Sequence, residues 1–158
     1  MFSISDLVLR ILKMRYLSID YGNKITGLAI CDPAETFISP LMALPTSNVL
    51  ISKIIQIIKS ENVEALVLGL PLNMDDSVGP QAKKVQAFAG QLKKQINIPL
   101  FFQDERLSTF AAQEKLVPME LTRKKKKYRI DALAAAEILR AFLDSKNSPP
   151  PTLGTTDS

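Results

Sequence analysis

The chain of 158 residues contains no histidine and no tryptophan, and its single cysteine is Cys31. Without histidine, the chain has no Ser-His-Asp triad, no histidine general base and no zinc site that needs imidazole. One cysteine excludes a disulfide within the chain and a metal cluster held by several thiolates. The available chemistry therefore rests on carboxylates, lysine, arginine, hydroxyl groups, the backbone or a hard metal ion. Cations such as Mg²⁺ prefer oxygen ligands, and carboxylates supply them.

Long apolar runs are also missing. No run is long enough to span a membrane, and the first fifteen residues lack the apolar stretch of a signal peptide. We therefore expect a cytoplasmic protein with no membrane partner. The net charge of +4 is compatible with a polyanionic partner, and six cations gather in the seven residues 123–129.

The hydrophobic pattern predicts the order β-β-β-α-β-α-β-α-α in one α/β domain. Three early strands joined by short turns favour an antiparallel half, and the later alternation favours parallel crossovers. We expect a mixed five-stranded sheet with helices on both faces. Ser47 or Asn48 is expected to cap the first helix. The predicted strands are 16–20, 26–31, 36–44, 65–69 and 99–103, and the later helices begin at Pro80, at Ser108 or Thr109, and at Ile130.

The domain is predicted to cover residues 15–144. Residues 1–14 are expected to be an N-terminal extension and 145–158 a disordered tail, which contains three consecutive prolines. Residues 118–129 are expected to form a polar, basic connection before the last helix.

Acids stand where predicted apolar elements end or begin. Asp20 ends the first strand, Asp104 and Glu105 follow the last one, and Asp131 opens the alanine-rich helix. Carboxylates at the ends of buried elements are costly unless they are hydrogen-bonded, paired or bound to a metal. We hypothesise that three of these acids meet in one site that holds divalent cations. Two such ions can promote phosphodiester hydrolysis without a histidine.

Each acid also has an ordinary structural explanation. Asp20 can form a turn before Gly22, and Asp104, Glu105 and Asp131 can stabilise helix N-termini. Adjacent acids on a strand point to opposite sides, so one can face a site while the other holds structure. Gly22 would let a phosphate approach the backbone, because it carries no Cβ.

Polar and basic residues near these acids are candidate substrate contacts. Asn73 and Ser77 lie in a loop between a strand and a helix, where active edges of α/β sheets are found, although an ordinary loop explains them equally well. The lysine run can be a solvated loop or a phosphate-binding segment that adds salt-dependent affinity. The candidate substrate contacts are Lys24, Asn73, Arg106, Lys124, Lys125, Lys126 and Lys127.

Four ordered motifs make the chain resemble the YqgF/RuvX family. They are Tyr-Leu-x-Ile-Asp20-Tyr-Gly22-x-Lys24, Leu-Gly69-Leu-Pro71-Leu-Asn73-Met-Asp75, Asp104-Glu105-Arg106-Leu-Ser108-Thr109 and Asp131-Ala-x-Ala-Ala, within residues 14–143. The resemblance implies a ribonuclease-H-like fold and a nuclease that processes the 5′ end of pre-16S rRNA in ribosome biogenesis. It implies Asp20, Glu105 and Asp131 as catalytic residues and ligands of Mg²⁺ or Mn²⁺. Two departures stand out: Asp76 replaces a frequent glycine, and four lysines replace a shorter Gly/Lys stretch.

Other functions remain open at this stage. The family has also been described as Holliday junction resolvases, so branched DNA is the alternative nucleic-acid substrate to pre-rRNA, and a resolvase would act as a homodimer rather than a monomer. A non-catalytic nucleic-acid-binding factor is a further alternative. An ATP-binding module of the actin and sugar-kinase type is disfavoured because that fold needs two such domains.

Overall fold

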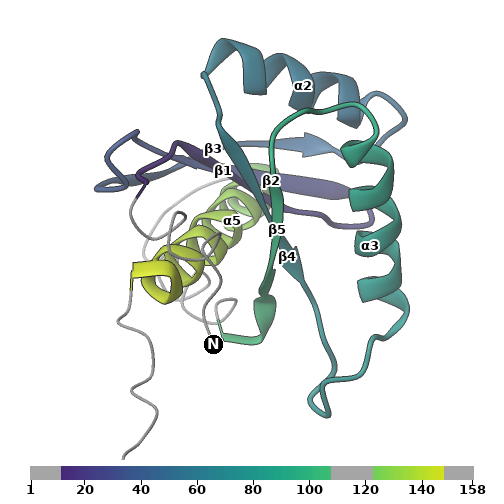
Figure 1. Cartoon of the computed structure of the whole chain (residues 1–158). Helices are drawn as coiled ribbons and strands as arrows, with labels where there is room; N and C mark the ends of the chain where they lie inside the picture. Colours follow the sequence, from purple (N-terminus) through teal and green to yellow (C-terminus); the bar gives the residue numbers. More distant parts are fainter. Residues whose placement is uncertain (1–11, 108–122, 148–158) are drawn as a thin grey trace, which may run out of the picture.

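The structure is a computed structural model that describes residues 12–107 and 123–147. A five-stranded sheet lies at its centre, with strands in the order β3-β2-β1-β4-β5 (Figure 1). The elements along the chain are β1 Tyr16–Asp20, β2 Ile25–Cys31, β3 Ile38–Pro45, α2 Leu50–Ser60, β4 Ala65–Leu70, α3 Pro80–Lys93, β5 Leu100–Asp104, the 3₁₀ turn η1 Glu105–Leu107 and α5 Arg123–Asn147.

The sheet is mixed, as the sequence pattern predicted. β1 pairs antiparallel with β2, and β2 pairs antiparallel with β3. β4 runs parallel to both β1 and β5, so the chain crosses over through α2 and α3. The carboxyl ends of β1, β4 and β5 consequently meet at one edge of the sheet, which is where such folds place their sites.

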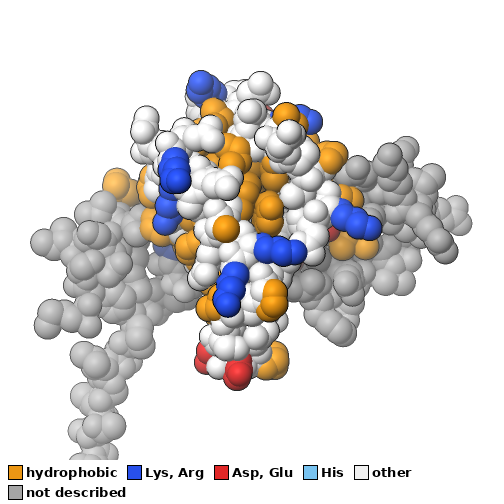
Figure 2. All heavy atoms as spheres, turned by 90° about the vertical axis from the view of Figure 1, so that its right-hand side faces the viewer, with side chains coloured by type: hydrophobic (Ala, Val, Ile, Leu, Met, Phe, Trp, Pro, Cys, Tyr) orange, Lys and Arg blue, Asp and Glu red, His pale blue; other side chains and the backbone are white. Residues whose placement is uncertain are grey.

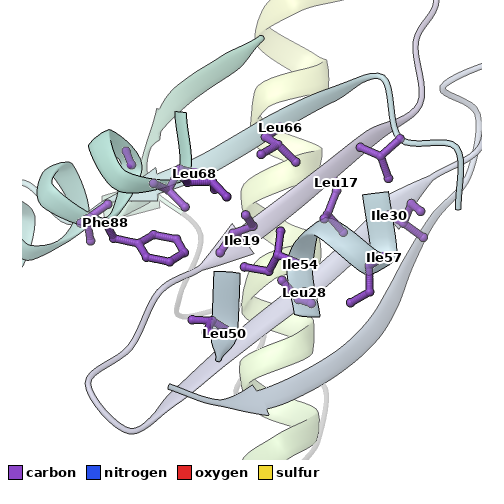
Figure 3. Close-up of a cluster of buried hydrophobic side chains, with 14 residues drawn as sticks. Leu17, Ile19, Leu28, Ile30, Leu50, Ile54, Ile57, Leu66, Leu68 and Phe88 are labelled. Carbon is purple, nitrogen blue, oxygen red and sulfur yellow. The ribbon is translucent and has the colours of Figure 1, made fainter. Parts of the chain in front are cut away.

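Alternation along β1 separates two cores. Leu17 and Ile19 face α2 and α3, whereas Tyr16 and Ser18 face α5 on the other side of the sheet. Figure 3 shows the first core, in which hydrophobic side chains from β1, β2 and β4 pack against those of α2 and α3. Burying each of these side chains stabilises the fold by roughly 1.5–3 kcal/mol. The residues labelled there are Leu17, Ile19, Leu28, Ile30, Leu50, Ile54, Ile57, Leu66, Leu68 and Phe88.

Small residues let α5 approach the opposite face closely. Ala135 and Ala136 pack on Ala29 of β2, and Ser18 Oγ donates to the Ala135 carbonyl at 2.6 Å. The alanine-rich run that Asp131 opens is therefore buried against the sheet. Helix α5 thereby fixes the position of Asp131 relative to the sheet.

The predicted start of the last helix was wrong. α5 begins at Arg123 and ends at Asn147, so part of the expected basic connection and of the expected tail is helical. Lysine and arginine are good helix formers, and no glycine or proline interrupts residues 123–147. The lysines of the basic run therefore occupy the first turns of α5. The helix expected to begin at Ser108 or Thr109 lies outside the described residues.

The predicted cap of the first helix also needs correction. Val49, not Ser47 or Asn48, is the N-cap residue of α2, and no side chain caps that helix. Ser47 Oγ instead accepts a hydrogen bond from the Val49 N–H at 3.3 Å, which forms a short turn before the helix. At Gly22, a Cβ would lie 2.3 Å from the Ile25 carbonyl oxygen, so the tight turn itself requires glycine there. The approach of a phosphate to this backbone stays a prediction.

A buried ion pair ties both ends of the described chain to the sheet. Glu35, which has a positive φ of 59°, accepts hydrogen bonds from Lys146 Nζ and, at 3.0 Å, from the Met14 N–H. Lys146 Nζ also donates to the Leu12 carbonyl at 3.0 Å. Residues 12–14 of the predicted extension thus contact the domain. None of the described helices is long and apolar enough to cross a membrane.

Candidate functional site

Asp20 and Glu105 come together at the carboxyl edge of the sheet. Asp20 ends β1, and Glu105 begins the turn directly after β5, two strands away. Their side chains are in hydrogen-bonding contact, although β4 separates their strands. Contact is possible because Gly69 of β4 lies between them: a Cβ there would come within 3.1 Å of Glu105 Cγ and Cδ. A single glycine in a strand signals such a close approach, and sequence reasoning had not used this signal.

The pKa of the Glu105 carboxyl is far above that of an ordinary glutamate. Burial raises its pKa first, and the hydrogen bond and negative charge of Asp20 raise it further, to about 9. Two carboxylates in contact cannot both ionise at low cost in a partly dry site. The cost of a second negative charge beside Asp20 therefore favours the protonated form of Glu105.

Asp131 lies at the same edge on the helix side of the sheet. Gly27 of β2 pairs with Asp20, and a Cβ on Gly27 would lie 2.0 Å from the Asp131 carbonyl oxygen. The backbone of α5 therefore rests on the strand residue next to Asp20. The Asp131 Oδ2 atom is shielded from solvent. Three elements thus bring the three predicted acids to one region.

As the side chains stand, the region is not a completed metal centre. The described residues contain no group of three or more acidic or cysteine side chains placed to hold a metal ion. The donor set nevertheless fits a divalent cation, because Asp20 and Glu105 offer hard oxygen ligands that are already in contact. Asp131 is the acid that would complete the set.

The Asp104 carboxylate, unlike that of its neighbour Glu105, is paired with an arginine. Its carboxylate accepts hydrogen bonds from Arg106 Nε at 3.0 and 2.9 Å and from Nη2 at 2.5 Å. These hydrogen bonds hold the pKa of Asp104 below its usual range. The prediction that one acid faces the site while the other holds structure agrees with this arrangement.

Arg106 joins the end of β5 to the loop between β4 and α3. Nη1 donates to the Asn73 carbonyl at 3.0 Å, and Nη2 pairs with Asp76 at 2.7 Å in addition to Asp104. Asp76 has a positive φ of 67°, a conformation that glycine adopts most easily, which explains why glycine suits this position. Here the substituted acid gains an arginine partner. Sequence reasoning had missed this link between Asp76 and Arg106.

The other candidate substrate contacts lie on three segments: the β4–α3 loop, the turn after β1 and the first turns of α5. The Asn73 amide donates to Ser77 Oγ at 2.9 Å and packs against Gly79, so this side chain shapes its own loop. Lys24 is exposed in the turn that follows Asp20. Lys124, Lys125, Lys126 and Lys127 precede Asp131 on α5, with their backbone helical.

The turn after Asp20 is held in place from two sides. Thr46 Oγ1 donates to the Gly22 carbonyl at 2.8 Å, and the Tyr21 ring stacks on Phe88 of α3 with centroids 4.4 Å apart. Gln81 Nε2 reaches the Tyr21 carbonyl at 3.4 Å. These contacts hold Tyr21 and Gly22 in place, and with them the backbone that carries Asp20.

Comparison with known proteins agrees with this fold and site. A protein from Roseiflexus sp. (strain RS-1), named "Putative pre-16S rRNA nuclease", is 42% identical over 135 residues, covering 84% of this chain and 95% of its own. A protein of the same name from Caldanaerobacter subterraneus subsp. tengcongensis is 40% identical over 139 residues, covering 85% of this chain and 100% of its own.

A solved structure supports the fold class. T. thermophilus RuvC in complex with a Holliday junction substrate aligns with a TM-score of 0.53 over 85% of this chain and 97% of that one, at 13% identity. At that identity the likeness concerns the ribonuclease-H-like fold alone. The family described as "RuvX: Holliday junction resolvase" matches residues 14–145. The chain, with Asp20 at the end of β1, Glu105 directly after β5 and Asp131 on α5, therefore belongs to the RuvX family of nucleases.

Proposed function

We propose that this protein is a metal-dependent nuclease that hydrolyses phosphodiester bonds at the edge where Asp20, Glu105 and Asp131 lie, and that its substrate is the 5′ region of pre-16S rRNA. The observation that carries the proposal is the contact between Asp20 and Glu105. An enzyme gains nothing in stability from pressing two carboxyl groups together in a partly buried place. A divalent cation that binds both would make the arrangement favourable.

The three acids would hold Mg²⁺ or Mn²⁺, ions that prefer oxygen ligands. When bound, such ions supply an activated water and stabilise charge on the leaving oxygen. The chain's own part is to release the proton of Glu105 and to present its carboxylate beside Asp20. Gly27 and Gly69 leave the space that this approach needs.

Positive charge beside the acids supports a nucleic-acid substrate. Residues 123–129 carry six cations, and they occupy the N-terminal turns of α5, where the helix dipole is also positive. No acidic residue in the first turn offsets this charge. The segment leads directly into Asp131, so phosphates drawn to it would lie close to the acids.

The names of the relatives favour RNA, and the family description keeps branched DNA as the alternative. One experiment separates them. A 5′ fragment of pre-16S rRNA and a four-way DNA junction are offered to the purified protein, each with Mn²⁺ and with chelator. The proposal expects cleavage of the RNA that requires the metal, with the junction left intact. Cleavage of the junction alone would transfer the proposal to branched DNA.

Variants connect that cleavage to the acids. Asp20→Asn and Asp131→Asn should each reduce the cleavage rate at least a hundredfold while unfolding as cooperatively as the wild type. Asp144→Asn is the matched control, because Asp144 is exposed near the other end of α5. Unchanged cleavage by either test variant would refute the assignment of the acids. Binding of RNA without any cleavage would show a non-catalytic factor instead.

A further inference from the structure

The loop between β4 and α3 has a fixed shape although it lies at the surface. The Asp76 N–H donates to the Asn73 carbonyl at 2.9 Å, which closes a reverse turn, and the Asn73 N–H donates to the Ser77 carbonyl at 3.0 Å. The Asp75 carboxylate accepts from the Ser77 N–H at 3.0 Å and from its hydroxyl at 2.5 Å. These bonds leave the loop few alternative conformations.

Met74 stands at the corner of this turn with 90% of its surface exposed. No other large hydrophobic side chain in the described part of the chain is as exposed. The hydrogen bonds that close the turn hold the Met74 backbone at its corner, and the side chain lies in solvent. The loop therefore keeps a flexible apolar side chain in water, where it contributes nothing to the fold.

The loop that carries Met74 is joined to the acidic site. Arg106, the residue after Glu105, donates to the Asn73 carbonyl at 3.0 Å and approaches the Met74 carbonyl at 3.5 Å. Gly69, which contacts the Glu105 side chain, lies in β4 two residues before the loop's first proline, Pro71. Arg106 therefore connects the loop directly to the segment that carries Glu105.

The charges beside Met74 indicate which part of a nucleic acid this loop can contact. Asp76 is paired with Arg106, whereas Asp75 is held ionised by Ser77, whose hydrogen bonds lower its pKa. A carboxylate next to Met74 repels phosphates, so the tip is unsuited to the backbone. In Figure 1 the loop between β4 and α3 lies at the lower end of the described chain. Figure 2 shows acidic and hydrophobic side chains side by side at that lower end.

We propose that Met74 packs on an unpaired base of the substrate, so that this site accepts nucleic acid with an unstacked nucleotide beside the cleaved bond rather than an uninterrupted duplex. The inference rests on the proposed nuclease function. Methionine is among the apolar side chains that proteins insert between bases, and a base has two apolar faces to offer. A perfectly stacked duplex hides those faces and gives Met74 no partner.

The test compares binding of three RNAs by the full-length chain carrying Asp131→Asn, which keeps the substrates intact. The RNAs are a single strand, a perfect duplex, and the same duplex with one bulged 2-aminopurine. Met74→Ala should weaken binding of the single strand and the bulged duplex about tenfold, comparable to the lower part of the range for a base stacked on an aromatic side chain, and leave the perfect duplex unchanged. The 2-aminopurine fluorescence change on binding should be lost with Met74→Ala.

Two further variants control the comparison. Met74→Leu should bind like the parent, because it keeps an apolar side chain at the tip. Phe37→Ala removes another exposed hydrophobic side chain, 71% exposed before β3, and should also bind like the parent. If Met74→Ala binds all three RNAs as the parent does, or alters only self-association, the inference is wrong while the nuclease proposal stands. If the parent binds none of the RNAs, both fail together.

Discussion

Glu105 is the residue whose protonation decides the state of the site. Burial and the neighbouring Asp20 raise its pKa, whereas Asp104, one residue earlier, is kept ionised by Arg106. The two acids of one dipeptide thus have opposite roles. The sequence pattern could predict this division, because adjacent side chains at a strand end point to opposite sides. It could not assign the roles, because that of Glu105 depends on contact with Asp20, 85 residues earlier in the chain.

The raised pKa predicts a pH dependence of stability. Between its ordinary value of 4.5 and about 9, folded Glu105 keeps a proton that the unfolded chain releases. The folded state then binds more protons, so the free energy of unfolding falls as pH rises, by at most about 1.4 kcal/mol per pH unit. Glu105→Gln should flatten this fall in denaturant titrations without added metal. Glu64→Gln, at an exposed position, is the control and should show the same decrease of unfolding free energy with pH as the wild type. The same decrease in Glu105→Gln would contradict the raised pKa of Glu105.

Arg106 was a candidate phosphate contact, and its surroundings give it another role to test. Its side-chain donors are directed at Asp104, Asp76 and the Asn73 carbonyl. Arg106→Lys removes the planar fork that makes these bonds together. We expect cleavage to fall at least tenfold while the dissociation constant for RNA stays within twofold. A comparable loss of affinity would show that the arginine binds phosphate directly.

At the scale of elements, two glycines set how closely β2 and β4 approach the site. Gly27→Ala would place a methyl group 2.0 Å from the Asp131 carbonyl oxygen and push α5 away from the sheet. We expect a loss of about 3 kcal/mol in the free energy of unfolding, measured by denaturant titration. A loss below about 0.5 kcal/mol would contradict the described contact between β2 and α5.

Gly90 provides the opposite case in α3. A Cβ there meets no heavy atom within 4 Å, and the residue lies inside the helix. Gly90→Ala should therefore stabilise the protein by about 0.5–1 kcal/mol through lower backbone entropy in the unfolded chain. The same denaturant titration measures it. Destabilisation would mean that the surroundings of α3 are more crowded than described.

The elements were predictable where a simple period repeats. Alternation in β1 and the continuous apolar run of β4 predicted both strands and the mixed sheet, because burial on one or two faces leaves that signature. The start of α5 was not predictable from apolar periodicity, since its first turns are almost entirely cationic. The contact of Gly69 with Glu105 was also hidden, because nothing local shows what a strand glycine faces.

At the scale of the whole molecule, α5 links the acidic site to a second anchor. Asp131 and Lys146 are fifteen residues apart, roughly 22 Å along a helix. Lys146→Met would leave the buried Glu35 carboxylate without its main cation and should cost about 3–5 kcal/mol of stability. Adding Glu35→Gln should recover part of that loss in thermal or denaturant unfolding. Equal stability of the wild type and Lys146→Met would contradict a buried pair.

The central claim is that the carboxylates of Asp20 in β1, Glu105 in η1 and Asp131 in α5 form one metal site. Binding of Mn²⁺ in solution tests it most directly. Electron paramagnetic resonance of free Mn²⁺ during a protein titration gives the dissociation constant without any substrate. We predict that Asp20→Asn, Glu105→Gln and Asp131→Asn each weaken binding at least tenfold, while Asp144→Asn binds like the wild type. Wild-type affinity in all three variants would contradict the claim.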